Sequence, residues 1–176
     1  MKKNVLVFGS IAGVIISVFM FISMMMLSKD PNFEGSMLVG YTAMLVAFSF
    51  VFVGIKNFRD KYNDGVITFG KGFKIGLFIS LIASTMYVIT WLIELHFFIP
   101  NFMELYANHV IDHAKASGAS AAELDKQIAE MASYKEMYKN PVYIILLTYM
   151  EILPIGILVT LISALILKKK VKPQTT

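Results

Sequence analysis

Four long apolar segments dominate the pattern of apolar and polar positions along this chain. They cover residues 5–27, 37–55, 73–99 and 142–167, and polar or turn-forming residues separate them. About 20 apolar residues in a helix are needed to cross the hydrocarbon layer of a bilayer. The pattern therefore predicts an all-α, polytopic membrane protein with four transmembrane helices in a single membrane domain over residues 1–176.

The first apolar segment follows Lys2 and Lys3, as the apolar part of a signal peptide would. A cleaved signal has an apolar region of about 7–15 residues and a site of small residues at its end. Here the apolar run is longer and ends in Met24-Met25-Met26-Leu27. We therefore expect a retained signal-anchor helix.

Residues 100–141, between the third and fourth segments, have the periodicity of two further helices. Apolar residues recur every three or four positions on each side of Gly118, and Ser120-x-x-Glu123 has the spacing of a capping box. A glycine between two helical runs favours a turn. We expect a helical hairpin that lies against the membrane surface or the ends of the spanning helices.

Composition agrees with a membrane location and excludes several kinds of site. The chain is 57% apolar and 16% charged, and it contains no cysteine. Disulfides, thiolate metal sites and cysteine nucleophiles are therefore excluded. The formal net charge is +4, but the basic residues flank the apolar segments, so they indicate the lipid bilayer as the partner and not nucleic acid.

The distribution of Lys and Arg predicts the orientation of the chain. Eleven lie at the amino end, between the second and third segments and at the carboxyl end, whereas five lie in the two other connections (Lys29, Lys115, Lys126, Lys135 and Lys139). Basic residues accumulate on the cytoplasmic side of membrane proteins. We expect a multi-pass protein of the bacterial inner membrane with both termini in the cytoplasm and residues 100–141 outside.

Small residues recur every four positions in three of the predicted spans. The stripes are Gly9, Gly13 and Ser17; Gly72, Gly76, Ser80 and Ser84; and Gly156, Thr160 and Ala164. Such stripes let helix backbones approach closely in lipid. They indicate packing within the bundle, with a homo-oligomer or another membrane protein as the alternative partner.

Two carboxyl groups lie inside the predicted spans, Glu94 in the third and Glu151 in the fourth. An ionisable group in the hydrocarbon costs roughly 2.5–3.5 kcal/mol on insertion scales and is a candidate functional site. One interpretation is a protonatable pair or polar cavity, with Tyr87, Trp91, Thr148 and Tyr149 as possible hydrogen-bond partners. The other is structural: Glu151 bonds between helices near Pro154, and Glu94 reaches the outer interface.

The predicted hairpin contains His109-x-x-Asp112-His113, and two histidines four residues apart can bind one metal ion. The spacing is similar to that of an inverted zinc-peptidase motif, which has Glu in place of Asp112. No third ligand is identifiable from spacing. A solvated helix face is the alternative, and we predict neither a metal nor another cofactor.

The segments Phe52-Val53-Gly54-Ile55-Lys56-Asn57-Phe58-Arg59-Asp60 and Gly65-x-Ile67-Thr68-Phe69-Gly70-Lys71-Gly72-Phe73-Lys74-Ile75-Gly76 resemble those of a bacterial membrane family catalogued as domain of unknown function 4199. The resemblance covers nearly the whole chain. It implies a short protein with four spans, and it implies no activity, cofactor or catalytic residue.

Three functions follow as hypotheses. The first is a non-enzymatic membrane protein of structural, accessory or interaction type, based on the small-residue stripes and the hairpin. The second is a small transporter or proton-coupled component that uses Glu94 and Glu151. The third is a metal-dependent membrane enzyme built on His109 and His113.

The predicted orientation can be tested with fusion reporters. Reporters at residue 60 and at the carboxyl end should report the cytoplasm, and a reporter near residue 118 should report the outside, because of the distribution of basic residues. A cytoplasmic signal at residue 118 would contradict the predicted orientation.

Overall fold

The computed structural model describes residues 1–29 and 37–169 and is built from helices. Each long apolar segment forms a helix, and the segment between the third and fourth forms two shorter ones. The elements are α1 (Lys2–Lys29), α2 (Met37–Tyr62), α3 (Phe69–Ile93), the π-helix η1 (Glu94–Phe98), α4 (Phe102–Ala116), α5 (Ala121–Met137) and α6 (Pro141–Leu167).

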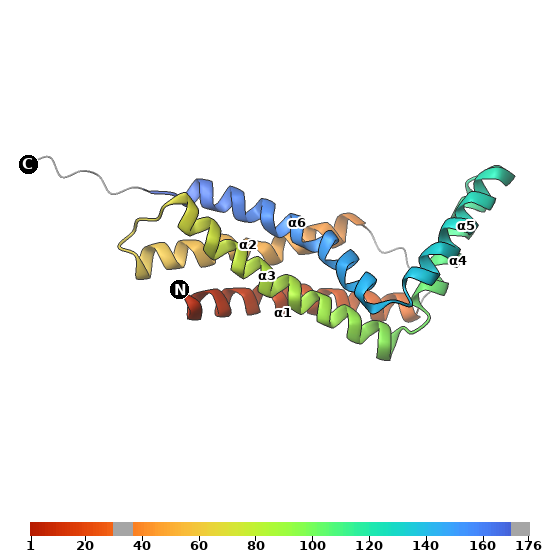
Figure 1. Cartoon of the computed structure of the whole chain (residues 1–176), viewed down its shortest axis with the longest axis horizontal. Helices are drawn as coiled ribbons and strands as arrows, with labels where there is room; N and C mark the ends of the chain where they lie inside the picture. Colours follow the sequence, from red (N-terminus) through yellow and green to blue (C-terminus); the bar gives the residue numbers. More distant parts are fainter. Residues whose placement is uncertain (30–36, 170–176) are drawn as a thin grey trace, which may run out of the picture.

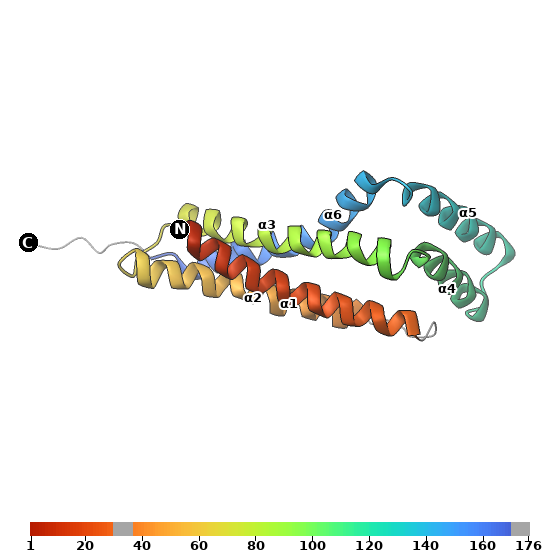
Figure 2. The same ribbon diagram turned by 90° about the horizontal axis from the view of Figure 1, so that it is seen from below.

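Helices α1, α2, α3 and α6 form an elongated bundle, and each is long and apolar enough to cross a membrane. The amino end of α1 and the carboxyl end of α6 lie at one end of the bundle, here called the terminal end (Figure 1). Helices α4 and α5 lie beyond the opposite end, here called the hairpin end (Figures 1 and 2). The predicted all-α architecture with four spans and a helical hairpin is confirmed.

The spanning helices extend further than the apolar pattern indicates, and the longest extensions are in α2 and α3. The second segment was expected to end at residue 55, but α2 continues to Tyr62. The third was expected to begin at residue 73, but α3 begins at Phe69, after the N-cap Thr68. Apolar length measures the part of a helix that fits the hydrocarbon, and helices can continue into the polar interface.

Helix α3 is the central element of the bundle: it packs against α1, α2 and α6, and half of its spanning window is buried, against a third in each of the other spans. Its small-residue stripe faces the stripe of α6, and the two helices run antiparallel. A Cβ added at Gly72 would lie 3.5 Å from the Cβ of Ala164, and one added at Gly76 would lie 2.7 Å from the Cγ2 of Thr160. The interpretation of these stripes as packing within the bundle is supported.

Hydrogen bonds join the same two helices next to these contacts. The hydroxyl of Ser80 donates to the carbonyl oxygen of Gly156 at 3.2 Å and lies 3.1 Å from the hydroxyl oxygen of Thr160. All three residues are buried. Side chains that hydrogen-bond between helices hold them together in lipid, where burial of apolar surface alone drives association weakly.

Helix α1 packs on a different face of α3, and the two run parallel. Added Cβ atoms at Gly9 and Gly13 would lie 2.8 Å from the Cβ of Ile82 and 2.4 Å from the Sδ of Met86, respectively. The glycines of α1 therefore receive large side chains of α3. The small residues of α3 meet small residues of α6.

The terminal end is closed by contacts between segments that are distant in sequence. Ile67, just before α3, and Lys169, just after α6, form an antiparallel β-bridge with N–H···O distances of 3.0 and 2.8 Å. The side-chain amide of Asn4 donates to the Oδ1 of Asn57 at 3.0 Å. These contacts join α1 to α2 and the end of α3 to the end of α6.

The two helices of the hairpin and the cap of the second form as the sequence predicts. Ser120 caps α5 in a capping box with Glu123, and Gly118 adopts a positive φ of 77° in the turn before it. Hydrogen bonds from the Ser120 hydroxyl and backbone N–H lower the pKa of Glu123. Helices α4 and α5 pack on one another through buried Ala107, Ala114 and Met131, and they extend away from the bundle (Figures 1 and 2).

Gly76→Ala should destabilise the protein, whereas Gly40→Ala in α2 should be neutral or stabilising. A Cβ at residue 76 would clash with Thr160, and overpacking costs about 1–3 kcal/mol. A Cβ at residue 40 would meet nothing within 4 Å, and alanine favours helix over glycine. Thermal unfolding of the two variants in the same detergent tests this, and equal midpoints would contradict close packing of α3 on α6.

Candidate functional site: an aromatic cavity at the hairpin end

A cavity of about 460 Å³ lies where the base of the hairpin meets the spanning helices. Residues of α1, α3, α4, α5 and α6 line it, together with Tyr138 just after α5. Six of the twelve lining residues are aromatic: Tyr87, Trp91, Phe102, Tyr106, Tyr134 and Tyr138. The volume is in the range of small-molecule sites.

Contacts between aromatic rings attach the hairpin to the bundle and form part of this wall. The ring of Phe102 at the start of α4 meets Trp91 of α3 edge to face, with centroids 4.8 Å apart. The same ring stacks on Tyr106 at 6.0 Å and lies 6.4 Å from Tyr138. The rings therefore come from α3, α4 and the segment just after α5, and contacts between the rings hold them in place.

Among the described residues, Glu151 is the one ionisable carboxyl in the lining, and no described Lys, Arg or His lines the cavity. Its side chain lines the cavity and is exposed. Within the described part of the chain it makes no hydrogen bond or ion pair. Pro154, inside α6, lacks the N–H that would bond the carbonyl of Met150, so the helix backbone near Glu151 is also incompletely bonded.

Glu94 has a different environment. Its side chain is only 1% exposed, and neither carboxyl oxygen has a hydrogen-bond partner among the described residues. The structural interpretation in which Glu94 reaches the outer interface is therefore wrong. Glu94 continues the buried face of α3, because it follows Tyr87 by seven residues and Trp91 by three, and these spacings return to one side of a helix.

A π-helical turn begins at Glu94. The N–H of Ile99 donates to the carbonyl of Glu94 at 2.8 Å, a bond between residues five positions apart. Such turns are rare and frequently lie at functional sites. His96, two residues on, is exposed, as its position on another face of the helix predicts.

The two carboxyl groups are brought to the same end of the bundle but not into contact. Tyr87 is within electrostatic range of both Glu94 and Glu151. Among the predicted hydrogen-bond partners, Tyr87, Trp91 and Thr148 line the cavity. Tyr149 does not: its hydroxyl lies 2.8 Å from the hydroxyl oxygen of Thr85.

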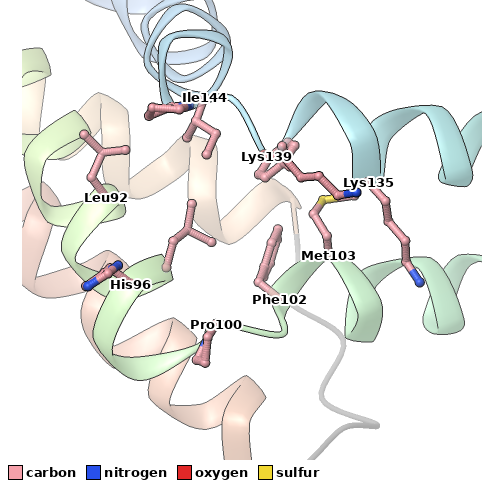
Figure 3. Close-up of a pocket in the computed structure, with 11 residues that line it drawn as sticks. Leu92, His96, Pro100, Phe102, Met103, Lys135, Lys139 and Ile144 are labelled. Carbon is pink, nitrogen blue, oxygen red and sulfur yellow. The ribbon is translucent and has the colours of Figure 1, made fainter.

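A second cavity of about 350 Å³ also lies at the hairpin base. Figure 3 shows Leu92 and His96 on one side of it, and Phe102 and Lys139 on the other. It also includes Lys135, and the ammonium of Lys139 forms an ion pair with Glu136 at 2.7 Å. Apart from Tyr138, the described ionisable side chains of this cavity are basic, whereas the larger cavity has a carboxyl group.

Tyr138 lines both cavities. Burial raises the pKa of its phenol, and the charge of Glu151 acts in the same direction. A raised phenol pKa keeps the hydroxyl neutral throughout the physiological pH range. Tyr138 therefore presents a neutral ring and a hydroxyl to either cavity.

The histidine pair of the hairpin stays on an exposed helix face. His109 and His113 are both exposed, and Asp112 pairs with Lys115 at 3.2 Å. Within residues 1–29 and 37–169, no three His, Cys, Asp or Glu side chains are grouped closely enough to hold a metal ion. The structure thus adds no third ligand to the pair.

Parts of this site are visible in the sequence, but only when its separate patterns are combined. The small-residue stripe of α3, continued by steps of three or four, reaches Tyr87, Trp91 and Glu94. In the hairpin, Tyr106, Tyr134 and Tyr138 are among the large side chains that recur at helical spacing. Their convergence on Glu151 depends on how the hairpin returns to the bundle.

Comparison with known proteins adds the family of the chain. No curated protein and no solved structure shows significant similarity to it. A family model described as "Protein of unknown function (DUF4199)" matches residues 7–169, nearly its whole length. This four-span protein with a helical hairpin belongs to the DUF4199 family.

Proposed function

We propose that this protein is a non-enzymatic membrane protein of interaction type, and that its hairpin α4–α5 is the part that contacts a partner. The observation that carries the proposal is the position of the hairpin, which extends beyond the bundle as a separate arm (Figures 1 and 2). The arm is not needed to cross the membrane. Its ordered helices and capping box hold a defined surface at a distance from the spans.

An exposed apolar side chain on the hairpin offers a contact point for a partner. Ile128 of α5 is 48% exposed, and it lies outside both cavities. The partner in this proposal is another membrane protein or a second copy of this chain.

We also propose that the hairpin lies outside the bacterial inner membrane and the termini lie in the cytoplasm. The terminal end of the bundle carries basic residues from several segments. They are Lys2, Lys3, Lys56, Arg59, Lys61, Lys71, Lys74, Lys168 and Lys169, while Lys170 and Lys172 lie outside the described residues. Their gathering at one end supports the orientation that the positive-inside rule predicts.

A photoreactive amino acid at residue 128 should give a discrete crosslinked product in membranes. The same photoreactive amino acid at position 62 should not give this product. The natural residue there, Tyr62, is 62% exposed at the terminal end of α2. The mass of the product separates a second copy from a different protein. Absence of a discrete product from residue 128, or the same product from residue 62, would contradict a contact through the hairpin.

A proton-coupled function is the second candidate, and the environment of Glu94 favours it. A carboxyl group that is buried within a span without a hydrogen-bond partner is costly, and such groups mark proton pathways in transporters. Glu151 lines the adjacent cavity, and Tyr87 is within electrostatic range of both.

If this candidate is right, the protein in liposomes should carry a proton flux that Glu94→Gln and Glu151→Gln each abolish. Glu104→Gln, which removes an exposed carboxyl from α4, should leave the flux unchanged. A pH-sensitive dye inside the liposomes measures it. Proton flux no faster than in empty liposomes, or unchanged in both variants, would exclude the candidate.

A further inference from the structure

We infer that the aromatic cavity binds an organic ammonium ion with a small apolar body. The inference goes beyond the contact proposed for the hairpin, because it rests on the inside of the hairpin base and not on its exposed face. Among the described residues, rings form half of the cavity lining and Glu151 is its one ionisable carboxyl. The ligand class follows from this combination.

The faces of aromatic rings attract cations, and several rings around a cavity are the usual means of binding a quaternary ammonium group. Phe102 is held between Trp91, Tyr106 and Tyr138 by ring contacts of 4.8 to 6.4 Å, so the rings are positioned before any ligand arrives. Preorganised groups bind with a smaller loss of conformational freedom.

Glu151 supplies the charge that selects a cation. It lines the cavity and is exposed, and among the described residues it has no ion pair and the lining holds no Lys, Arg or His that would neutralise it. The basic residues nearby line the second cavity, where Lys139 pairs with Glu136. An anion would meet an unpaired carboxyl in the larger cavity and would be repelled.

The remaining lining defines the body of the ligand. Met20 and Met24 of α1 and Leu147 of α6 close the side of the spanning helices. Methionine side chains adapt to different apolar shapes. The ligand therefore has a cationic nitrogen and an apolar portion, as in a free organic cation or the ammonium head group of a lipid.

Intrinsic tryptophan fluorescence can show whether this cavity is occupied, because Trp91 is the single tryptophan of the chain and lies in the cavity wall. Titration of the purified full-length protein with benzyltrimethylammonium chloride should change tryptophan fluorescence and reach saturation. Benzyl alcohol and phenylacetate, which are neutral and anionic, should give no saturable change over the same concentrations.

Glu151→Gln should weaken binding of benzyltrimethylammonium on the order of tenfold or more, since it removes the charge opposite the cation. Glu104→Gln removes a carboxyl from the same end of the protein but outside the cavity, and it should bind as the wild type does. Equal affinity of Glu151→Gln and wild type would overturn the inference, as would a response as strong to benzyl alcohol.

A second pair of variants tests the rings and keeps the inference testable if Glu151→Gln does not fold. Tyr106 is 47% exposed, so its substitution should be tolerated. Tyr106→Leu should weaken binding about two- to fivefold and Tyr106→Phe should not, because only leucine removes the ring. Identical affinities of the two variants would contradict cation binding by the rings.

Competition with short-chain lipids distinguishes the two sources of the ammonium ion, a lipid head group and a free organic cation. Short-chain phosphatidylethanolamine should displace benzyltrimethylammonium if the natural ligand is a lipid head group, and short-chain phosphatidylglycerol should not. Failure of both lipids to displace the probe would assign the site to a free organic cation. Displacement by both lipids alike would show that the probe occupies an unspecific lipid-facing surface, and would overturn the inference.

Discussion

The close approach of α3 and α6 is the contact on which the rest of the structure depends. Gly72 and Gly76 of α3 face Ala164 and Thr160 of α6, and Ser80 hydrogen-bonds to Gly156. In lipid, apolar side chains gain little by leaving the solvent for one another, so helices associate through close packing and interhelical hydrogen bonds. Small side chains permit both. The central position of α3 then arranges α1 and α2 around it.

The same packing determines the chemistry of the hairpin end. Continuing the buried face of α3 beyond its small residues places Tyr87, Trp91 and Glu94 between the other helices. Small side chains give way to rings at this end of the bundle. The cavity lies there, and rings of the hairpin line it together with those of α3.

The two intramembrane carboxyl groups show how different environments can arise within one site. Glu94 is enclosed and has no hydrogen-bond partner among the described residues, whereas Glu151 is accessible from the cavity. An accessible carboxyl can meet a cationic ligand. An enclosed one can exchange a proton but cannot touch a ligand in that cavity. The proposed functions of the two groups are therefore separable, although Tyr87 is within electrostatic range of both.

Local properties of the sequence are enough to predict the four spans, the hairpin and its capping box. A run of apolar residues requires a helix in lipid, and Ser120 and Glu123 lie within one turn of each other. The small-residue stripes also indicate which faces of α3 and α6 pack closely. The fold is needed to see that Glu94 is buried, that Tyr149 contacts Thr85, and that Tyr106 and Tyr138 line one cavity with Trp91 and Glu151. These features depend on packing between segments that are distant in sequence, which local patterns do not report.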